Sequence, residues 1–376
     1  GAGRTRSRGI RNNGEAVMNP SLLVELLTEE LPPKALRQMG ERFAQSLVDS
    51  LARAGLMNPG GAAGVRVFAT PRRLAALLGD VRVRADDRVE EKKLMPAKVA
   101  FAADGSASAA LTKRLEKECA SFDQVERRMD GGTEYAFLKQ LIPGVALAAG
   151  LQHALQEAIE KLPIPKLMSY QLDDGVTSVK FVRPAHSLIA LHGDSVIDVS
   201  VLGLQAGRVT RGLRFQGARF IEIAAADAYE EALAAHGSII ASFDARRSEI
   251  EKQLREMART MGASLGPEEA ITPLLDEVTA LVEHPTVYAG QFEPEFLNVP
   301  QECLVLTMRT NQKYFPLFDT AGTLVNRFLI VSNMRLTQPR NIVEGNQRVV
   351  RPRLADARFF FETDSKTRLE SRAPQL

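Results

Sequence analysis

The sequence predicts a multidomain protein of mixed α/β (α+β) class, with antiparallel and mixed sheets, packed helices and a helical C-terminal part. Its 376 residues are 45% hydrophobic and 25% charged, a composition that provides cores for two or three globular domains. Short apolar runs alternate with a helical pattern near the N-terminus, whereas residues 176–203 have the two-residue period of antiparallel strands. After residue 205, a period of three to four residues predominates and predicts helices.

The N-terminal residues predict a strand, a helix and two further elements. The apolar run Ser21–Leu27 is typical of a buried strand, and the two prolines that follow suit the first turn of a helix. Apolar residues then recur at every third or fourth position until Gly55, which indicates one amphipathic helix. Val65–Ala69 is predicted to be the next strand, and Leu74–Leu78 a strand or a short helix.

Residues 84–132 differ from their surroundings because they are highly charged and rich in turn signals. We predict a small helical insertion there, within an α/β core domain that comprises residues 19–83 and 133–205. The core is expected to resume with a strand at Tyr135–Leu141. Val145–Leu162 then has the apolar stripe of a helix that ends at two prolines.

The second half of the chain predicts helices and short strands. Residues 206–300 are assigned to a helical or α+β region, and residues 301–376 to a basic α/β segment that leads to further domains outside this sequence. Pro352 is expected in the first turn of a second helix there. The expected helices are Ala224–Ala235, Ala245–Met261, Glu268–Val282 and 341–363, and the expected strands are Val287–Ala289, Phe315–Phe318 and Arg327–Ser332.

The chain ends and the composition restrict the class of protein. Residues 1–18 are basic and almost without apolar side chains, so we expect a disordered extension and no signal peptide. The last residues lack a terminating feature, and we expect the chain to be part of a longer one. No run of 18 apolar residues is present, so no membrane partner is expected. Cys119 and Cys303 are expected to be reduced, buried thiols of a cytoplasmic protein.

Motifs of nucleotide and metal chemistry are absent from the sequence. It has no phosphate-binding glycine loop, no dinucleotide fingerprint and no pair of histidines at metal-ligand spacing. Gly262–Gly266 has the letters of a serine hydrolase elbow around Ser264, but a long helical pattern precedes it where a strand is required. We therefore interpret it as a helix end, and a hydrolase as a lesser alternative. We expect no catalytic residue, no metal and no cofactor on this chain.

The clustering of arginine in a few segments is the feature of the sequence that indicates a binding surface. It stands out because the whole chain carries a net charge of only +2. Residues 301–360 hold nine basic and four acidic groups, and residues 201–220 hold four arginines and no acid. Arginine forms paired hydrogen bonds with phosphate, but also with carboxylates inside a protein or on a partner chain. Arg72 and Arg73, next to a turn, are expected in structural salt bridges. The candidate phosphate-binding residues are Arg208, Arg211, Arg214, Arg309, Lys313, Arg348, Arg351 and Arg353.

Several ordered blocks of sequence give the chain a resemblance to a known family. They are ELLTEELP (25–32), FATPRRL (68–74), FVRPAH (181–186), TRG (210–212) with Arg214 and Phe215, LVEHP (281–285), PQE (300–302), Met308 and Arg309, QKYFP (312–316), GNQRV (345–349) and RLADARFF (353–360). With them, residues 18–376 resemble the β-subunit family of the bacterial tetrameric glycyl-tRNA synthetases. The resemblance covers the N-terminal portion of that subunit, which is similar to the B3/B4 domain of the phenylalanyl enzyme's β subunit.

The resemblance implies a division of labour between two kinds of subunit. The α subunit would carry the class II active site and use ATP and Mg²⁺, while the β subunit docks on it and positions tRNA(Gly). HD-type, body and anticodon-binding domains would follow further along the β chain, and no DNA partner is expected. Glu29 and Glu30 are candidates for the α interface, with helix capping as the alternative. The competing hypothesis for the whole chain is a purely structural subunit scaffold whose arginines contact only protein.

Overall fold

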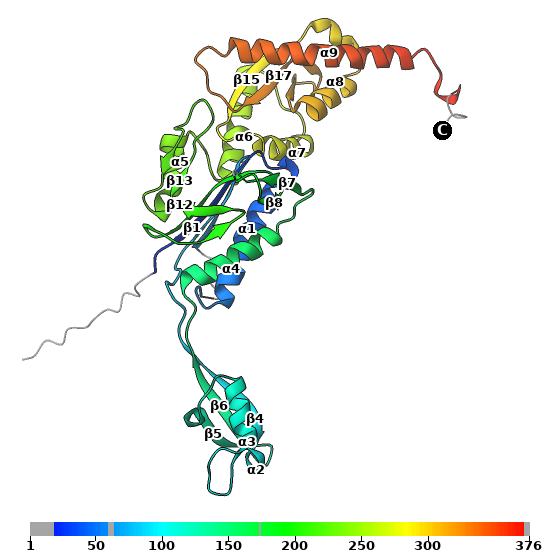
Figure 1. Cartoon of the computed structure of the whole chain (residues 1–376). Helices are drawn as coiled ribbons and strands as arrows, with labels where there is room; N and C mark the ends of the chain where they lie inside the picture. The colour runs from blue at the N-terminus through cyan, green and yellow to red at the C-terminus, as the bar shows by residue number, and fades with distance from the viewer. Residues whose placement is uncertain (1–18, 59–63, 173, 372–376) are drawn as a thin grey trace, which may run out of the picture.

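The computed structural model describes residues 19–58, 64–172 and 174–371, and it confirms the mixed α/β class. Three packed regions follow one another in space, with a central sheet domain between a small domain on a two-stranded stalk and a C-terminal α/β region (Figure 1). Residues 1–18, for which we expect a disordered extension, lie outside the described part.

The central domain is built on one mixed sheet. Its strand order is β11-β12-β9-β1-β3-β2, with β10 also paired to β9. Every pairing is antiparallel except that of β12 with β9. The strands are β1 (Leu22–Thr28), β2 (Val65–Thr70), β3 (Arg73–Leu78), β9 (Ala185–His192), β10 (Ser195–Val196), β11 (Ser200–Val201) and β12 (Leu204–Gly207). The residues 74–78, left open between strand and helix, therefore lie in a strand.

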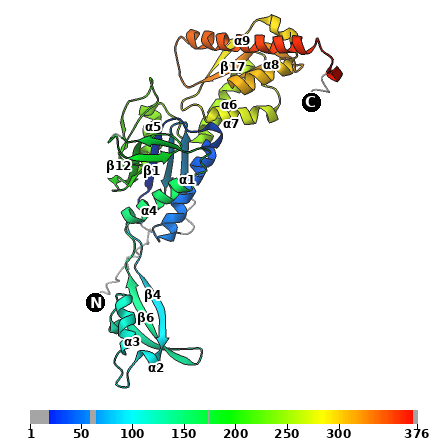
Figure 2. The ribbon, with the colours of Figure 1, turned by 45° about the vertical axis from the view of Figure 1, so that its right-hand side comes forward.

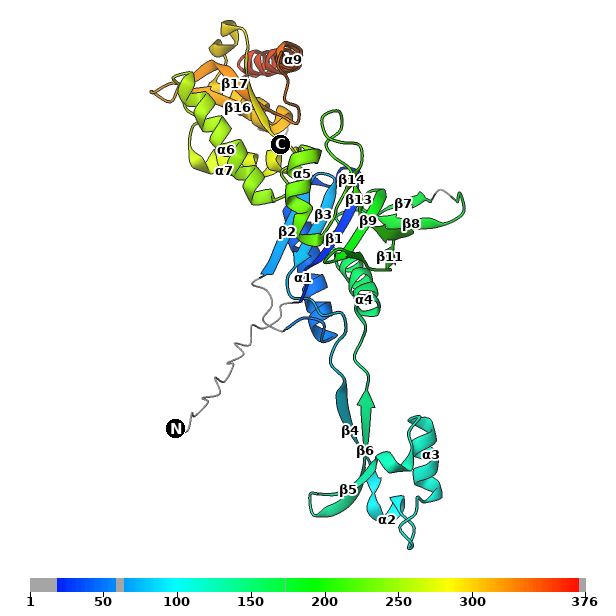
Figure 3. The same ribbon diagram turned by 90° about the vertical axis from the view of Figure 1, so that its left-hand side faces the viewer.

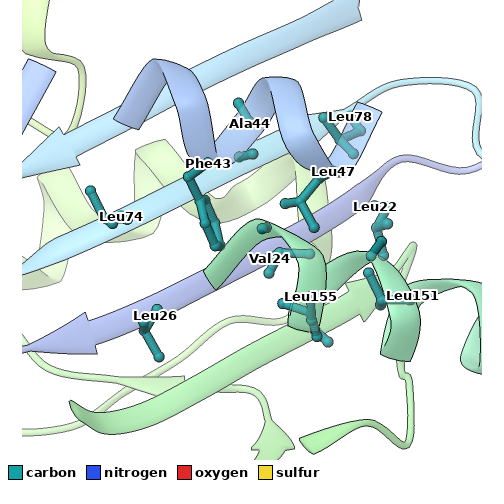
Figure 4. Close-up of a cluster of buried hydrophobic side chains, with 14 of the residues drawn as sticks. Leu22, Val24, Leu26, Phe43, Ala44, Leu47, Leu74, Leu78, Leu151 and Leu155 are labelled. Carbon is teal, nitrogen blue, oxygen red and sulfur yellow. The ribbon is translucent and has the colours of Figure 1, made fainter. Parts of the chain in front are cut away.

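Two helices, α1 (Pro33–Arg53) and α4 (Leu147–Glu160), cover one face of this sheet. The apolar stripe of α1 predicts this packing, since side chains three and four residues apart share one helix face. Figure 4 shows Phe43 and Leu47 of α1 among the leucines of α4, β1 and β3. Gly40 permits the close approach, because a Cβ there would lie 2.8 Å from the Ala69 Cβ.

The opposite face is covered by segments that follow residue 206. They are the paired strands β13 (Val209–Thr210) and β14 (Ile221–Glu222), and helix α5 (Tyr229–Gly237). Together with Leu23, Phe68 and other sheet residues they form a second core. The boundary that we place at residue 205 therefore does not coincide with a change of packing. A separate ribbon pairs β7 (Met168–Gln171) with β8 (Ser178–Phe181).

The insertion is not purely helical, and its last strand lies beyond the expected boundary at residue 132. Strands β4 (Arg88–Pro96), β5 (Val125–Asp130) and β6 (Thr133–Ile142) form a three-stranded antiparallel sheet in the order β4-β6-β5. The predicted strand at 135–141 exists, but it pairs here and not in the core. Strand β4 could not be predicted from the sequence because the first six residues of its RVEEKKLMP segment are solvated on both faces, so the segment lacks an apolar alternation. Helices α2 (Ala97–Ala100) and α3 (Ala109–Lys117) complete this domain (Figure 2).

The C-terminal region is a three-stranded antiparallel sheet between two layers of helices (Figure 3). Helices α6 and α7 pack on one face, and α8 and α9 on the other. This region starts near residue 243, so the expected boundary at residue 300 divides one packing unit. Its elements are α6 (Phe243–Thr260), α7 (Glu268–Thr279), β15 (Thr286–Gln291), α8 (Gln301–Thr307), β16 (Phe315–Phe318), β17 (Leu324–Ser332) and α9 (Arg340–Asp364).

Two expectations about single residues are wrong. Pro352 does not begin a new helix but lies inside the continuous α9. A proline there removes one helical hydrogen bond, at a cost of about 3 kcal/mol, which the burial of Val350 and Leu354 on either side offsets. Cys119 is exposed and Cys303 half-buried, so the expectation that both thiols are buried is wrong.

None of the described helices combines the length and the apolar character that crossing a bilayer requires.

Candidate nucleic-acid interface

A buried arginine organises the junction between the central sheet and the segments packed on it. Arg73 on β3 is 1% exposed. Its Nη1 donates to the Glu283 carboxylate at 2.7 Å, and its Nε lies 3.4 Å from the Glu25 carboxylate. Burial disfavours the charge, but Glu283 and Glu25 outweigh that effect and raise the pKa of Arg73. The structural salt bridge expected for Arg73 is therefore present.

A second buried arginine joins the C-terminal region to the same sheet. Arg246 on α6 donates to the backbone carbonyls of Ala69 at 2.7 Å, Ile240 at 2.7 Å and Thr279 at 3.1 Å. Burial lowers its pKa to about 10. Because these bonds link β2, α6 and α7, the two regions are fixed against each other by buried polar contacts as well as by apolar packing.

The segment between β13 and β14, residues 211–220, is attached firmly to this junction. Arg73 Nη2 donates to the Arg211 carbonyl at 2.6 Å, and the Leu213 amide donates to the Gly237 carbonyl at 2.8 Å. Glycine is required at Gly217, where a Cβ would lie 2.2 Å from the Gly237 oxygen. Gln216 exchanges two hydrogen bonds with the backbone of Arg335, at 2.6 and 3.0 Å. We call residues 211–220 the arginine loop.

The arginine loop encloses a basic hollow of about 220 Å³. Arg72, Arg211, Arg214 and Arg219 line it together with Phe215, and no carboxylate is among its lining residues. Arg72 is 6% exposed, and its Nε has no hydrogen-bond partner in the described part of the chain. Burial lowers the pKa of Arg72, although the nearby Glu283 opposes this shift. Of the two adjacent arginines, Arg73 thus forms the expected salt bridge and Arg72 does not.

Aromatic rings accompany these cations. Phe215 has a φ of +73° and is 92% exposed. Phe220 is 58% exposed, and the guanidinium groups of Arg211 and Arg219 lie 5.9 and 5.3 Å from the centre of its ring. Neither of these two arginines forms an ion pair with a described residue. The loop therefore displays free positive charge beside exposed aromatic surface.

Glu29 connects β1 to the arginine loop. Its carboxylate lies 2.7 Å from His186 Nε2 and accepts two hydrogen bonds from Arg214 Nη2, both at 3.0 Å. Burial raises the pKa of Glu29, but the His186 hydrogen bond and the Arg214 charge overcome this and lower it. Neither Glu29 nor Glu30 caps α1, which begins after Pro32 without a side-chain cap, so the capping alternative is wrong. Glu30 is exposed, and its carbonyl accepts a hydrogen bond from Arg183.

The remaining predicted basic residues do not converge on this hollow. Arg208 donates to the carbonyls of Asp194 and Ala224, and so fixes the chain locally. Lys313 pairs with Glu277 at 3.0 Å, and Arg351 with Glu293 at 2.5 Å. Arg348 is well exposed and lies 4.0 Å from Glu344. Arg353 is exposed on α9 and Arg309 is half-buried, and burial lowers the pKa of Arg309.

Of the five charged or aromatic side chains that line the hollow, two are candidate phosphate contacts from the sequence, and their binding role stays a prediction. Arg211 and Arg214 were among the candidates, whereas Phe215 and Arg72 were not assigned to a binding site. Phe215 had a signal, since an aromatic residue between arginines in a glycine-containing segment is typical of a loop that binds nucleic acid. Arg72 had none, because only the fold shows which of two adjacent arginines receives the buried carboxylates.

Metal ligands and the serine motif bear on whether the chain itself breaks bonds. The described ranges contain no group of three or more His, Cys, Asp or Glu side chains that could hold a metal ion. Ser264 follows the end of α6, and its backbone forms two hydrogen bonds with Phe318, at 2.8 and 2.9 Å. The Gly262–Gly266 segment is thus a helix end followed by an extended bridge, as interpreted from the sequence.

The fold and the candidate site together define a multidomain α/β protein with a basic hollow beside exposed aromatic rings. The chain belongs to the family described as glycyl-tRNA synthetase beta subunit, whose sequence model matches residues 22–376. It is similar to proteins named glycine–tRNA ligase beta subunit from Aromatoleum aromaticum (55% identical over 359 residues) and Leptothrix cholodnii (53% over 362 residues). In both comparisons 95% of this chain and 50% of the relative are covered, so the chain spans about half the length of these relatives.

Proposed function

We propose that this chain forms part of the β subunit of a glycine–tRNA ligase, where it docks on a catalytic α subunit and positions tRNA(Gly) for ATP-dependent glycylation in the cytoplasm. The arginine loop is the observation that carries the proposal. It holds Arg211, Arg214 and Arg219 beside exposed rings on a frame fixed by the buried Arg73. A loop backbone fixed in this way presents charge to phosphates with a smaller loss of conformational entropy on binding.

In this proposal the chain contributes to the reaction without a catalytic residue of its own. ATP and Mg²⁺ belong to the α subunit, which activates glycine. The β chain holds the tRNA so that its acceptor end reaches the activated amino acid. Fixing two reactants in place makes a bimolecular step effectively unimolecular, which is catalysis by proximity.

A salt titration of tRNA(Gly) binding to the assembled α–β enzyme tests the tRNA contact. The double variant Arg211→Ala, Arg214→Ala is expected to bind about tenfold more weakly near 0.1 M salt, with a log–log salt slope shallower by roughly 1–2, because up to two phosphate contacts are lost. Arg259→Ala, an exposed arginine on α6, is the matched control and should leave both quantities unchanged. Equal affinity and slope for the double variant and the control would contradict a tRNA contact at this loop.

The structural-scaffold alternative has its own supporting observation. Arg351 and Lys313 pair with carboxylates of the same chain, and among the described residues Arg208 donates to backbone carbonyls alone. The same titration can be applied to the double variant Arg348→Ala, Arg351→Ala. It then decides between tRNA binding and protein contact for the basic residues of the segment 301–360. An unchanged affinity and slope assign these arginines to protein contacts, whereas a weaker, less salt-sensitive interaction assigns them to tRNA.

A further inference from the structure

The arginine loop has the features of a site for one unpaired nucleotide, and this inference rests on the proposed function. We infer that the basic hollow receives a phosphate of single-stranded RNA against Arg72, while the neighbouring base stacks on the exposed ring of Phe215. The loop would then bind the RNA through a defined pocket as well as through its general positive potential.

The unpartnered Arg72 points to an anionic ligand. Arg72 is only 6% exposed, and its Nε has no hydrogen-bond partner among the described residues. A buried donor without a partner costs about 1–3 kcal/mol, and more for a charged group. Arg211 and Arg219 add further charge to the lining of the hollow. The carboxylates near Arg72 already have other partners, since Glu283 binds Arg73 and Glu29 binds Arg214 and His186. Because Arg72 is one of the residues that line the hollow, a phosphate there would place acceptor oxygens and negative charge beside its guanidinium group.

The conformation of Phe215 indicates that the anionic ligand also carries a planar group that stacks on the ring. A non-glycine residue at a φ of +73° is strained, and its large apolar ring is 92% exposed. Neither property stabilises the fold, and strained residues of this kind concentrate at binding sites. A nucleotide combines a phosphate with a flat aromatic face, and bases stack on exposed aromatic rings in proteins that bind single strands.

The size of the hollow favours one nucleotide phosphate over a larger ligand. Its volume of about 220 Å³ is below the range of about 300–1,000 Å³ that is usual for pockets holding drug-sized molecules. We place the base outside the hollow, on the exposed ring of Phe215, which is one of the lining residues. A base within a duplex is already stacked on both sides, so only an unpaired nucleotide can use this ring.

Phe215→Trp provides a direct readout, because the 376 residues contain no other tryptophan. Titration of this chain with a single-stranded RNA hexamer is expected to quench the indole fluorescence in a saturable way, and millimolar inorganic phosphate should compete. An RNA duplex of the same sequence should quench much less. Absence of quenching, or equal quenching by the duplex, would overturn the nucleotide pocket.

Phe215→Gly in the assembled enzyme separates this inference from the proposed function. Glycine accepts the positive φ without strain, so the variant should fold while losing only the ring. We expect tRNA(Gly) to bind about five- to fiftyfold more weakly, with an unchanged salt slope, since stacking is not ionic. If the double arginine variant is impaired but Phe215→Gly is not, the tRNA contact stands and the pocket is wrong. If neither variant is impaired, both proposals fail. Loss of α-subunit co-elution with unchanged RNA binding would assign the ring to a protein contact, and so also overturn the pocket.

Discussion

At the scale of single residues, two adjacent arginines have opposite roles, Arg72 in the β2–β3 turn and Arg73 at the start of β3. Arg73 receives both buried carboxylates, Glu25 and Glu283, and orients the arginine loop through the Arg211 carbonyl. Arg72 is nearly as buried but lacks a partner for its Nε. Since burying a charged group without an ion-pair partner is unfavourable, stability alone does not account for Arg72, whereas the two buried carboxylates account for the burial of Arg73.

Replacement of Arg73 is therefore expected to be severe. Arg73→Met keeps the volume but leaves Glu25 and Glu283 buried without their counter-charge, and should lower the free energy of unfolding by about 3–5 kcal/mol. Urea denaturation followed by circular dichroism measures this loss. Addition of Glu283→Gln should recover part of it, because one uncompensated charge is removed. The exposed Arg219→Met is the control, and a loss of stability no greater than that of the control would contradict the role of Arg73.

At the scale of elements, the strands and helices with an apolar period were predictable and the charged or context-dependent ones were not. The helix stripe of α1 and the strands at 65–69, 315–318 and 327–332 are confirmed, since their burial is visible as a local pattern. Strand β4 and the continuity of α9 through Pro352 were not predictable, because most of β4 is solvated on both faces and α9 depends on burial elsewhere in the helix.

The features of the candidate site likewise divide into those that are predictable from the sequence and those that are not. The cations of the arginine loop are visible in the sequence, whereas its shape depends on contacts with residues far away along the chain. Gly212 and Gly217 allow the loop to lie against Gly237, and Arg73 fixes it from β3. Local patterns contain no signal for such contacts, so the hollow and its unpartnered Arg72 emerge only from the folded chain.

The packing of the loop leads to a prediction about glycine. In Gly217→Ala the new Cβ would lie 2.2 Å from the Gly237 oxygen, so the loop has to move. We expect a melting temperature lower by several degrees and weaker binding of tRNA(Gly), since about 1 kcal/mol shifts the midpoint of a domain by about 2–8 °C. Gly207→Ala is the matched control, because a Cβ there meets no atom within 4 Å. The role of the loop would be contradicted if both variants melted and bound alike.

At the scale of the whole molecule, the three regions differ in how firmly they are joined. Buried bonds from Arg73 and Arg246 link the central sheet to the C-terminal region. The insertion, in contrast, has a separate small core to which only its own residues contribute. Its two connections meet the central domain at backbone hydrogen bonds such as that from the Ala85 amide to the Val145 carbonyl. The insertion should therefore fold and unfold independently of the other two regions.

Removal of the insertion tests this independence. Arg88 and Ile142 are antiparallel partners in the stalk, so residues 89–141 can be replaced by an Asn-Gly turn that closes the two strands as a hairpin. We expect the shortened chain to keep the melting temperature of the central domain within a few degrees, because no side chain of the central core is deleted. Calorimetry of the intact chain should show an additional, smaller transition that disappears in the shortened one. A shortened chain that melts far lower, or that no longer folds, would show that the insertion stabilises the centre of the molecule through contacts beyond the stalk.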